Sequence, residues 1–215
     1  MFLHGAQTPS STPYPHPWLG LPISEVSPEE VQEVSPAYSK KVPNETYKAA
    51  AHLVVSGKKR RFSNVNIILA HLGGSTPFLA ARVAALSYHM GCPLTPAEII
   101  EDFKSFYYET ALSAHETTLT AMVTFVPLNR LLFGTDFPGN CRNCATHCTF
   151  DDDLILAAST KTVEWYTENL EKYLANRPLD LANVMRNNAL SLFPNLGKTK
   201  VDHQVIVDHR PHPSE

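Results

Sequence analysis

Residues 64–74 read NVNIILAHLGG and decide the fold. Within this stretch, Ile67 to Ala70 form a short apolar run between polar residues and glycine, which is typical of a strand buried on both faces of a parallel sheet. His71 follows directly at the carboxyl end of this strand. α/β barrels and open α/β sheets gather their functional side chains at that end, because the loops there converge on one face.

A helix is predicted after the two glycines. Ser75 or Thr76 can supply its N-cap, and Pro77 suits its first position. Residues 78–90 repeat apolar side chains at helical spacing, and Gly91 provides a stop. The unit therefore reads strand, histidine, glycine turn and helix.

The same alternation extends along the chain. Further apolar strands are predicted at residues 2–4, 106–112 and 130–137, and the helices between and after them are expected at 44–57 with Asn44 as cap, 96–106, 116–126, 162–175 and, capped at Asp180, 181–193. Strands that alternate with helices indicate βαβ units, and hence an α/β fold built on a parallel sheet.

Composition excludes several classes of protein. The 215 residues are 43% hydrophobic, which is enough for one sizeable core, and a net charge of −3 gives no reason to expect nucleic acid or an anionic membrane as partner. The basic run Lys58 to Arg61 is interpreted as a solvated helix end. With neither a membrane-spanning stretch nor a recognisable signal peptide, a cytoplasmic location is expected.

Three segments interrupt the alternation. Residues 27–41 and 139–160 are interpreted as inserts within a single domain spanning 1–197, and the polar tail 198–215 is expected to be disordered.

Polar side chains end three of the predicted strands: His4, His71 and Asp136. In a parallel barrel they would point into the same mouth. Imidazole and carboxylate both bind Zn²⁺, and a catalytic zinc site uses about three protein ligands with one position open. Taken singly, each histidine could be a structural, hydrogen-bonded residue and the aspartate a helix cap. Their common place in the pattern favours a metal site.

A family resemblance is carried by five stretches, in order along the chain. They are FLHG (2–5), NIILAHLGGSTPFLAARV (66–83), FYYETALS (106–113), NRLLFGTDFP (129–138) and NVMRNNALSLFP (183–194). The chain resembles the amidohydrolase-related metal-dependent decarboxylases, which include the aminocarboxymuconate semialdehyde, γ-resorcylate and 6-methylsalicylate decarboxylases. The wording at 4–9, 106–117 and 133–138 is most similar to the 6-methylsalicylate enzymes.

The resemblance implies a TIM barrel, (β/α)8, and a role for each strand-end residue. His4 matches the metal-binding histidine of the fifth strand, Asp136 the metal-binding aspartate of the eighth, and His71 the acid/base histidine of the sixth. The implied cofactor is Zn²⁺ or Mn²⁺, with no organic cofactor. The implied reaction is non-oxidative decarboxylation of a small aromatic or enoic carboxylic acid, with Asp136 as proton carrier and His71 assisting.

Four other residues are candidates for the substrate pocket. Trp18, Phe78 and Arg82 could line or support it, although aromatic and long basic side chains usually only pack. His115 follows a predicted strand end and could face the mouth, or it could be a surface histidine at a helix start.

The resemblance covers only part of the family pattern. Members begin with a strand carrying His-x-His and three more βα units, and residues 1–215 contain neither. We therefore expect about the C-terminal half of the barrel, four βα units plus the final helices, and interpret the chain as an incomplete or mis-spliced decarboxylase. The family is commonly dimeric or larger, so a homo-oligomer is expected.

Two alternative functions remain open from the sequence. The same metal site could support hydrolysis, since the fold hosts both reactions. The chain could instead be an inactive fragment that acts only through subunit contacts. About one tightly held metal ion per chain would indicate an active site, and none would indicate the fragment.

A cysteine cluster offers a third possibility. Cys141, Cys144, His147 and Cys148 could form a compact structural zinc site, although no second Cys-x-x-Cys pair completes the usual pattern. The alternative is a disordered insert. Replacement Cys144→Ser would abolish zinc binding only in the first case.

Overall fold

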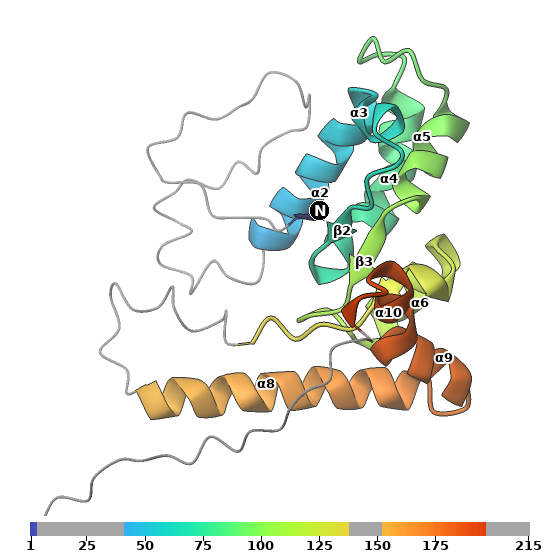
Figure 1. The fold of residues 1–215 in the computed structure, drawn as a ribbon. Coiled ribbons are helices and arrows are strands. Elements are labelled where there is room, and N and C mark those ends of the chain that lie inside the picture. Colours follow the sequence, from blue (N-terminus) through green and yellow to red (C-terminus); the bar gives the residue numbers. More distant parts are fainter. Residues whose placement is uncertain (4–40, 138–151, 197–215) are drawn as a thin grey trace, which may run out of the picture.

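The computed structural model describes residues 1–3, 41–137 and 152–196 (Figure 1). Several sequence predictions lie outside these described residues: His4, Trp18, Cys141, Cys144, His147, Cys148, almost all of the 27–41 segment, and the tail.

A four-stranded parallel sheet confirms the predicted α/β architecture. Its spatial order follows the chain, β1-β2-β3-β4. Phe2 pairs with Ile68, Ile68 with Tyr107, and Tyr108 with Leu131, all in parallel register. The strands are shorter than predicted: β1 is Phe2–Leu3, β2 is Ile68–Leu69, β3 is Tyr107–Glu109 and β4 is Leu131–Leu132.

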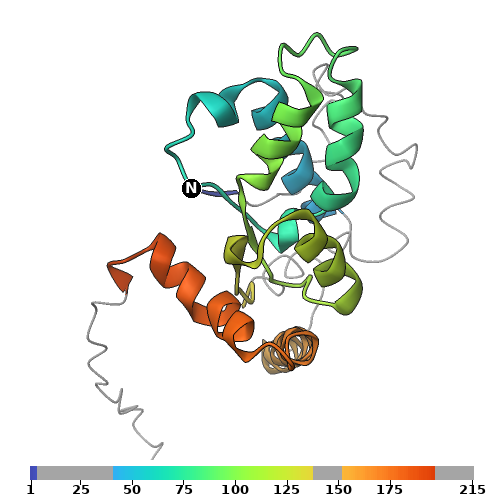
Figure 2. The same cartoon turned by 90° about the vertical axis from the view of Figure 1, so that its right-hand side faces the viewer.

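Helices follow β2, β3 and β4, as predicted. Those of the described residues are α2 (Lys41–Val55), α3 (Lys58–Arg61), α4 (Thr76–Leu86), α5 (Pro96–Lys104), α6 (Glu116–Phe125), α8 (Asp152–Tyr173), α9 (Pro178–Ala182) and α10 (Asn188–Leu192), with short turns of 3-10 helix at His71–Gly73 and Leu128–Arg130 and of π-helix at Asn183–Asn187. Helices α2 to α5 gather around β2, and Figure 2 looks along α8, which lies against α6. None of the helices described is both long and apolar enough to cross a bilayer.

The core forms where these helices meet the strands. Fully buried side chains come from β2, β3 and α5, including Leu69, Tyr108 and Phe103. The predicted start of α5 is confirmed by a capping box, in which the Thr95 side chain accepts from the Glu98 N–H and Glu98 accepts from the Thr95 N–H.

Several predicted helix boundaries are wrong. Helix α2 begins at Lys41, three residues before the predicted cap Asn44, whose side chain instead accepts from Ser75 Oγ at 2.7 Å. Helix α4 ends at Leu86 rather than at Gly91. Helix α8 begins at Asp152 rather than at 162, inside the segment 139–160 that was interpreted as an insert, so residues 152–160 extend a helix.

The C-terminal helix also starts differently from the prediction. Arg177, not Asp180, is the N-cap of α9, and the Asp180 carboxylate accepts from Arg177 Nε at 2.7 Å. The predicted single helix is divided into α9, the π-helical turn and α10.

The basic run is more than a solvated helix end. Gly57 has a φ of 69° and separates α3 from α2. Lys59 is buried, its ammonium lies 5.3 Å from the centre of the Phe106 ring, and burial lowers its pKa. Arg60 pairs with Asp102 at 3.1 Å, and so the run fastens α3 to α5.

The outer side of β4 is held by the C-terminal helical segment. Asn188 is buried, and its side-chain amide donates to the carbonyls of Leu128 and Leu131, both at 2.9 Å. The Phe133 N–H donates to the Val184 carbonyl at 3.0 Å. One buried amide thus satisfies carbonyls at and just before β4.

Replacing Asn188 should therefore loosen this edge. We expect Asn188→Ala to lower the free energy of unfolding by about 1–3 kcal/mol, because two carbonyls lose their buried donor. The matched control is Asn187→Ala, which removes an exposed amide that donates to Asn183 Oδ1 and should cost less than about 0.5 kcal/mol. Denaturant unfolding of the two variants measures the difference, and equal losses would contradict the assignment.

Candidate functional site

Left-handed backbone marks the carboxyl end of the sheet. Among the described residues other than glycine, four have positive φ: His71 at 54°, Leu72 at 51°, Leu112 at 52° and Asp136 at 55°. All four follow β2, β3 or β4. Such conformations cost about 1–3 kcal/mol each and persist where surrounding contacts enforce them, which is common at functional sites.

His71 is held by the end of β3. It is buried, and its Nδ1 lies 3.0 Å from the Ala111 carbonyl oxygen. A carbonyl only accepts, so Nδ1 carries a proton, and in the neutral ring Nε2 carries the lone pair. The His71 backbone N–H donates to Glu109 Oε2 at 3.3 Å.

Glu109 is the site residue that the sequence analysis missed. It is 8% exposed, and its Oε1 accepts from the Ala111 N–H at 2.6 Å. Burial raises the pKa of this carboxyl to about 7; the N–H donors of Ala111 and His71 oppose the rise, and the Asp136 charge adds to it. The sequence prediction placed Glu109 inside a strand running to Leu112, whereas β3 ends at Glu109 itself.

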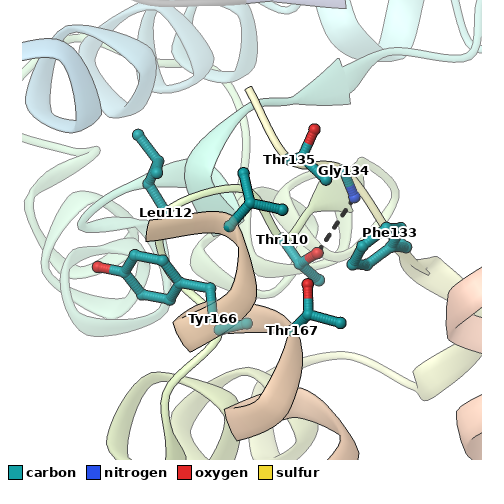
Figure 3. Close-up of a pocket in the computed structure, with 9 residues that line it drawn as sticks. Thr110, Leu112, Phe133, Gly134, Thr135, Tyr166 and Thr167 are labelled. Carbon is teal, nitrogen blue, oxygen red and sulfur yellow. Dashed lines mark hydrogen bonds between the residues drawn. The ribbon is translucent and has the colours of Figure 1, made fainter. Parts of the chain in front are cut away.

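Gly134, which follows β4, lies against the same carboxylate. A Cβ on Gly134 would collide with Glu109 Oε1, so only glycine leaves room for the carboxylate there. The Gly134 N–H donates to Thr110 Oγ1 at 3.2 Å, as the dashed line in Figure 3 shows. These contacts bring β3 and β4 together two residues before Asp136.

Two hollows lie beside this edge. One, of about 170 Å³, is lined by residues that include His71, Phe78 and Ser113. The other, shown in Figure 3, lies between the ends of β3 and β4 and helix α8 and holds only about 10 Å³, near the space of one water. Pockets for drug-sized ligands have volumes of about 300 Å³ or more, so each hollow of the described residues is smaller than such a pocket.

Of the three predicted pocket residues that the structure describes, Phe78, Arg82 and His115, only Phe78 lines one of the two hollows. Phe78 is 60% exposed and lines the hollow beside His71. Arg82 is exposed on α4 and lines neither hollow; burial raises the pKa of Tyr47 on α2 to about 12, and the Arg82 charge opposes that rise. His115 is an exposed N-cap whose ring stacks on Trp165 at 5.6 Å.

The described residues fit only part of the expected metal site. Within 1–3, 41–137 and 152–196, no three His, Cys, Asp or Glu side chains group together as metal ligands would. Asp136 supplies a carboxylate suited to Zn²⁺ or Mn²⁺, and the other expected ligand, His4, is outside this part of the chain. His71 follows β2 and Asp136 follows β4, on either side of β3. Glu109 at the end of β3 lies between them: it accepts from the His71 N–H, and the Asp136 charge raises its pKa.

Sequence comparison finds decarboxylases. No family model matches the chain. A 6-methylsalicylic acid decarboxylase of Aspergillus aculeatus is 30% identical over 166 residues, covering 74% of this chain and 45% of the relative. A decarboxylase of Penicillium terrestre is 31% identical over 183 residues, covering 83% and 48%. The chain thus spans about half the length of these curated relatives.

Solved structures confirm the amidohydrolase-type barrel fold, of which the chain again covers about half. A 2,6-dihydroxybenzoate decarboxylase from Rhizobium matches with a TM-score of 0.58 and 20% identity, covering 91% of this chain and 51% of that one. The apo IDCase of Metarhizium anisopliae matches with 0.56 and 22%, covering 74% and 42%. A dihydroxybenzoic acid decarboxylase from Polaromonas sp. JS666, with bound manganese and an inhibitor, gives 0.52 and 23%, covering 77% and 44%.

The raised pKa of Glu109 predicts a stability change with pH. Between its ordinary value of 4.5 and about 7, the unfolded chain releases this proton while the folded chain retains it. The folded state should therefore lose stability as the pH rises through this window, by up to about 3 kcal/mol from this group. Glu109→Gln removes the titration and should remove that part of the slope.

Unfolding in denaturant at pH values from 4 to 8 measures the effect. The matched control is Glu101→Gln on exposed α5 surface, which should keep the slope of the unmodified chain. A slope in Glu109→Gln equal to that of the control would contradict the assignment.

Proposed function

We propose that this chain, a relative of the amidohydrolase-type decarboxylases in sequence and fold, is a metal-dependent decarboxylase, and that its described residues form the carboxyl-terminal part of the site. The substrate class is a small aromatic or enoic carboxylic acid similar to 6-methylsalicylate. The observation that carries the proposal is the imidazole of His71, fixed by the Ala111 carbonyl after β2, at the same edge of the sheet as Asp136 after β4, in a chain related to named decarboxylases.

A divalent cation, Zn²⁺ or Mn²⁺, is part of the proposal. Asp136 and His4 would hold it, and the manganese of the Polaromonas relative supports this class of ion. When bound, such an ion supplies Lewis acidity that orients and polarises an anionic carboxylate.

Asp136 and His71 would then carry out the proton transfer. Asp136 would deliver a proton to the ring carbon that bears the carboxylate, and His71 would assist through Nε2, because its Nδ1 proton is engaged with Ala111. After protonation, the bond from that carbon to the carboxylate breaks, its electron pair returns to the ring, and CO₂ leaves. Phe78, beside His71, would pack against the ring of the substrate.

Assembly and location complete the proposal. Strand β1 is at the edge of the sheet, and an edge strand offers backbone groups for pairing, which supports assembly into a homo-oligomer. The cytoplasmic location stays a prediction.

Turnover tests the proposal. The full chain, incubated with Mn²⁺ or Zn²⁺ and 6-methylsalicylic acid, should release CO₂ and 3-methylphenol, and chelation should stop the reaction. Asp136→Asn and His71→Gln should each lower kcat about 100-fold or more, since positioned acids and bases contribute about 10²–10⁴-fold. The control His89→Gln, an exposed residue, should keep the activity.

Other outcomes select the alternatives. Release of an alcohol or amine from an ester or amide, without CO₂, would indicate hydrolysis. Absence of both turnover and metal binding would indicate an inactive fragment, and equal activity of all three variants would overturn the assigned roles.

A further inference from the structure

We propose that Glu109 is the positioning residue of His71: its carboxylate fixes the Ala111 peptide, and that peptide in turn holds the imidazole with the proton on Nδ1 and the lone pair on Nε2. The consequence for turnover rests on the proposed function, whereas the consequence for the imidazole does not.

The first step is the bridge made by the two carboxylate oxygens. Oε1 accepts from the Ala111 N–H at 2.6 Å, and Oε2 accepts from the His71 N–H at 3.3 Å. Both bonds are buried. One side chain therefore sets the distance between His71 and Ala111, which lie two positions after β2 and β3 respectively.

The second step concerns the backbone of Ala111, which bonds to Glu109 through its N–H and to His71 through its carbonyl. Its N–H is bound by Glu109, and its carbonyl oxygen lies 3.0 Å from His71 Nδ1. Ala111 is 2% exposed, so water does not compete freely for this carbonyl. The position of the carbonyl determines which ring nitrogen carries the proton, because a carbonyl can only accept.

The third step is strain. His71 and Leu112 both have left-handed backbone, with φ of 54° and 52°. Left-handed residues other than glycine persist where contacts over-determine them. The Glu109 bonds act on His71 itself and on the residue before Leu112, so they hold both conformations.

The fourth step is the confinement of the carboxylate from the β4 side. A Cβ on Gly134 would collide with Glu109 Oε1, and the Gly134 N–H is tied to Thr110. The Thr110 N–H donates to the Leu132 carbonyl at 3.0 Å. Glu109 therefore cannot swing toward β4 without moving the strand end.

A carboxylate suits this place better than an amide of the same shape. Two N–H donors converge on its two oxygens, whereas a glutamine has one acceptor oxygen and would direct its NH₂ at the other donor. Glu109→Gln thus preserves volume and breaks one arm of the bridge, which makes it the sharpest variant.

The tautomer of His71 tests the proposal directly. Nitrogen-15 NMR of the full chain labelled at histidine distinguishes Nδ1–H from Nε2–H, and His71→Gln identifies the signal. At pH 8.5, above the Glu109 pKa of about 7, the carboxyl is ionised and both of its oxygens accept. Under this condition the unmodified chain and the control Glu101→Gln should show the neutral ring with its proton on Nδ1, and Glu109→Gln should show a mixture. In the metal-loaded enzyme, Glu109→Gln should lower kcat about 10- to 100-fold, as loss of a ligand-orienting partner does, with KM changed less than about threefold.

A second variant keeps the proposal testable if Glu109→Gln does not fold. Gly134→Ala keeps the glutamate but displaces its carboxylate, and it should shift the tautomer in the same direction. Retention of the Nδ1–H form in Glu109→Gln, or in Gly134→Ala if only that variant folds, would overturn the proposal. If the unmodified chain shows no turnover, the proposed function fails while the tautomer still decides the role of Glu109.

Discussion

The bridge of the Glu109 carboxylate to the N–H groups of His71 and Ala111 is the interaction on which the carboxyl edge of the sheet depends. Parallel strands bring their carboxyl ends to one edge, but the strand ladder stops at Leu69 and Glu109. Beyond that point the backbone turns left-handed, and the buried carboxylate supplies the acceptors that the ladder no longer provides. The site is therefore continuous with the sheet rather than carried on loose loops.

Contacts with α5 and with the C-terminal helical segment hold the strands that end at this edge. Tyr108 lies fully buried beside Glu109 in β3, and its hydroxyl donates to the Phe103 carbonyl at the end of α5. On the other flank, Asn188 binds carbonyls at and before β4. Because β3 and β4 are held from both sides, a change at either support is expected to reach Glu109 through Thr110 and Gly134.

Local patterns in the sequence predicted much of this architecture. The apolar run before His71, the Thr95 cap and the strand-helix alternation depend on neighbours in the chain, so they are readable without a structure. Asn44 shows the opposite case, because a contact with Ser75 thirty-one residues away overrides its capping preference. Lys59 is a second such case, because its burial depends on Phe106, which lies 47 positions further along the chain.

Within the candidate site, the same division applies. His71 and Asp136 stood out because each interrupts an apolar pattern abruptly. Glu109 did not, because it lies inside FYYETAL, a stretch predicted as strand throughout. Its importance comes from the His71 N–H and from Gly134, which other strand ends supply. Partners of this kind are long-range, and sequence periodicity does not contain them.

The central claim is that His71 and Asp136 serve one metal site at the carboxyl edge of the sheet. Paramagnetic Mn²⁺ tests it most directly, because a bound ion broadens the NMR signals of nearby histidines. Our account predicts that substoichiometric Mn²⁺ broadens the His71 ring signals and spares those of His89, and that Asp136→Asn abolishes the effect. Equal broadening of both histidines, or selective broadening of His71 that persists in Asp136→Asn, would contradict it.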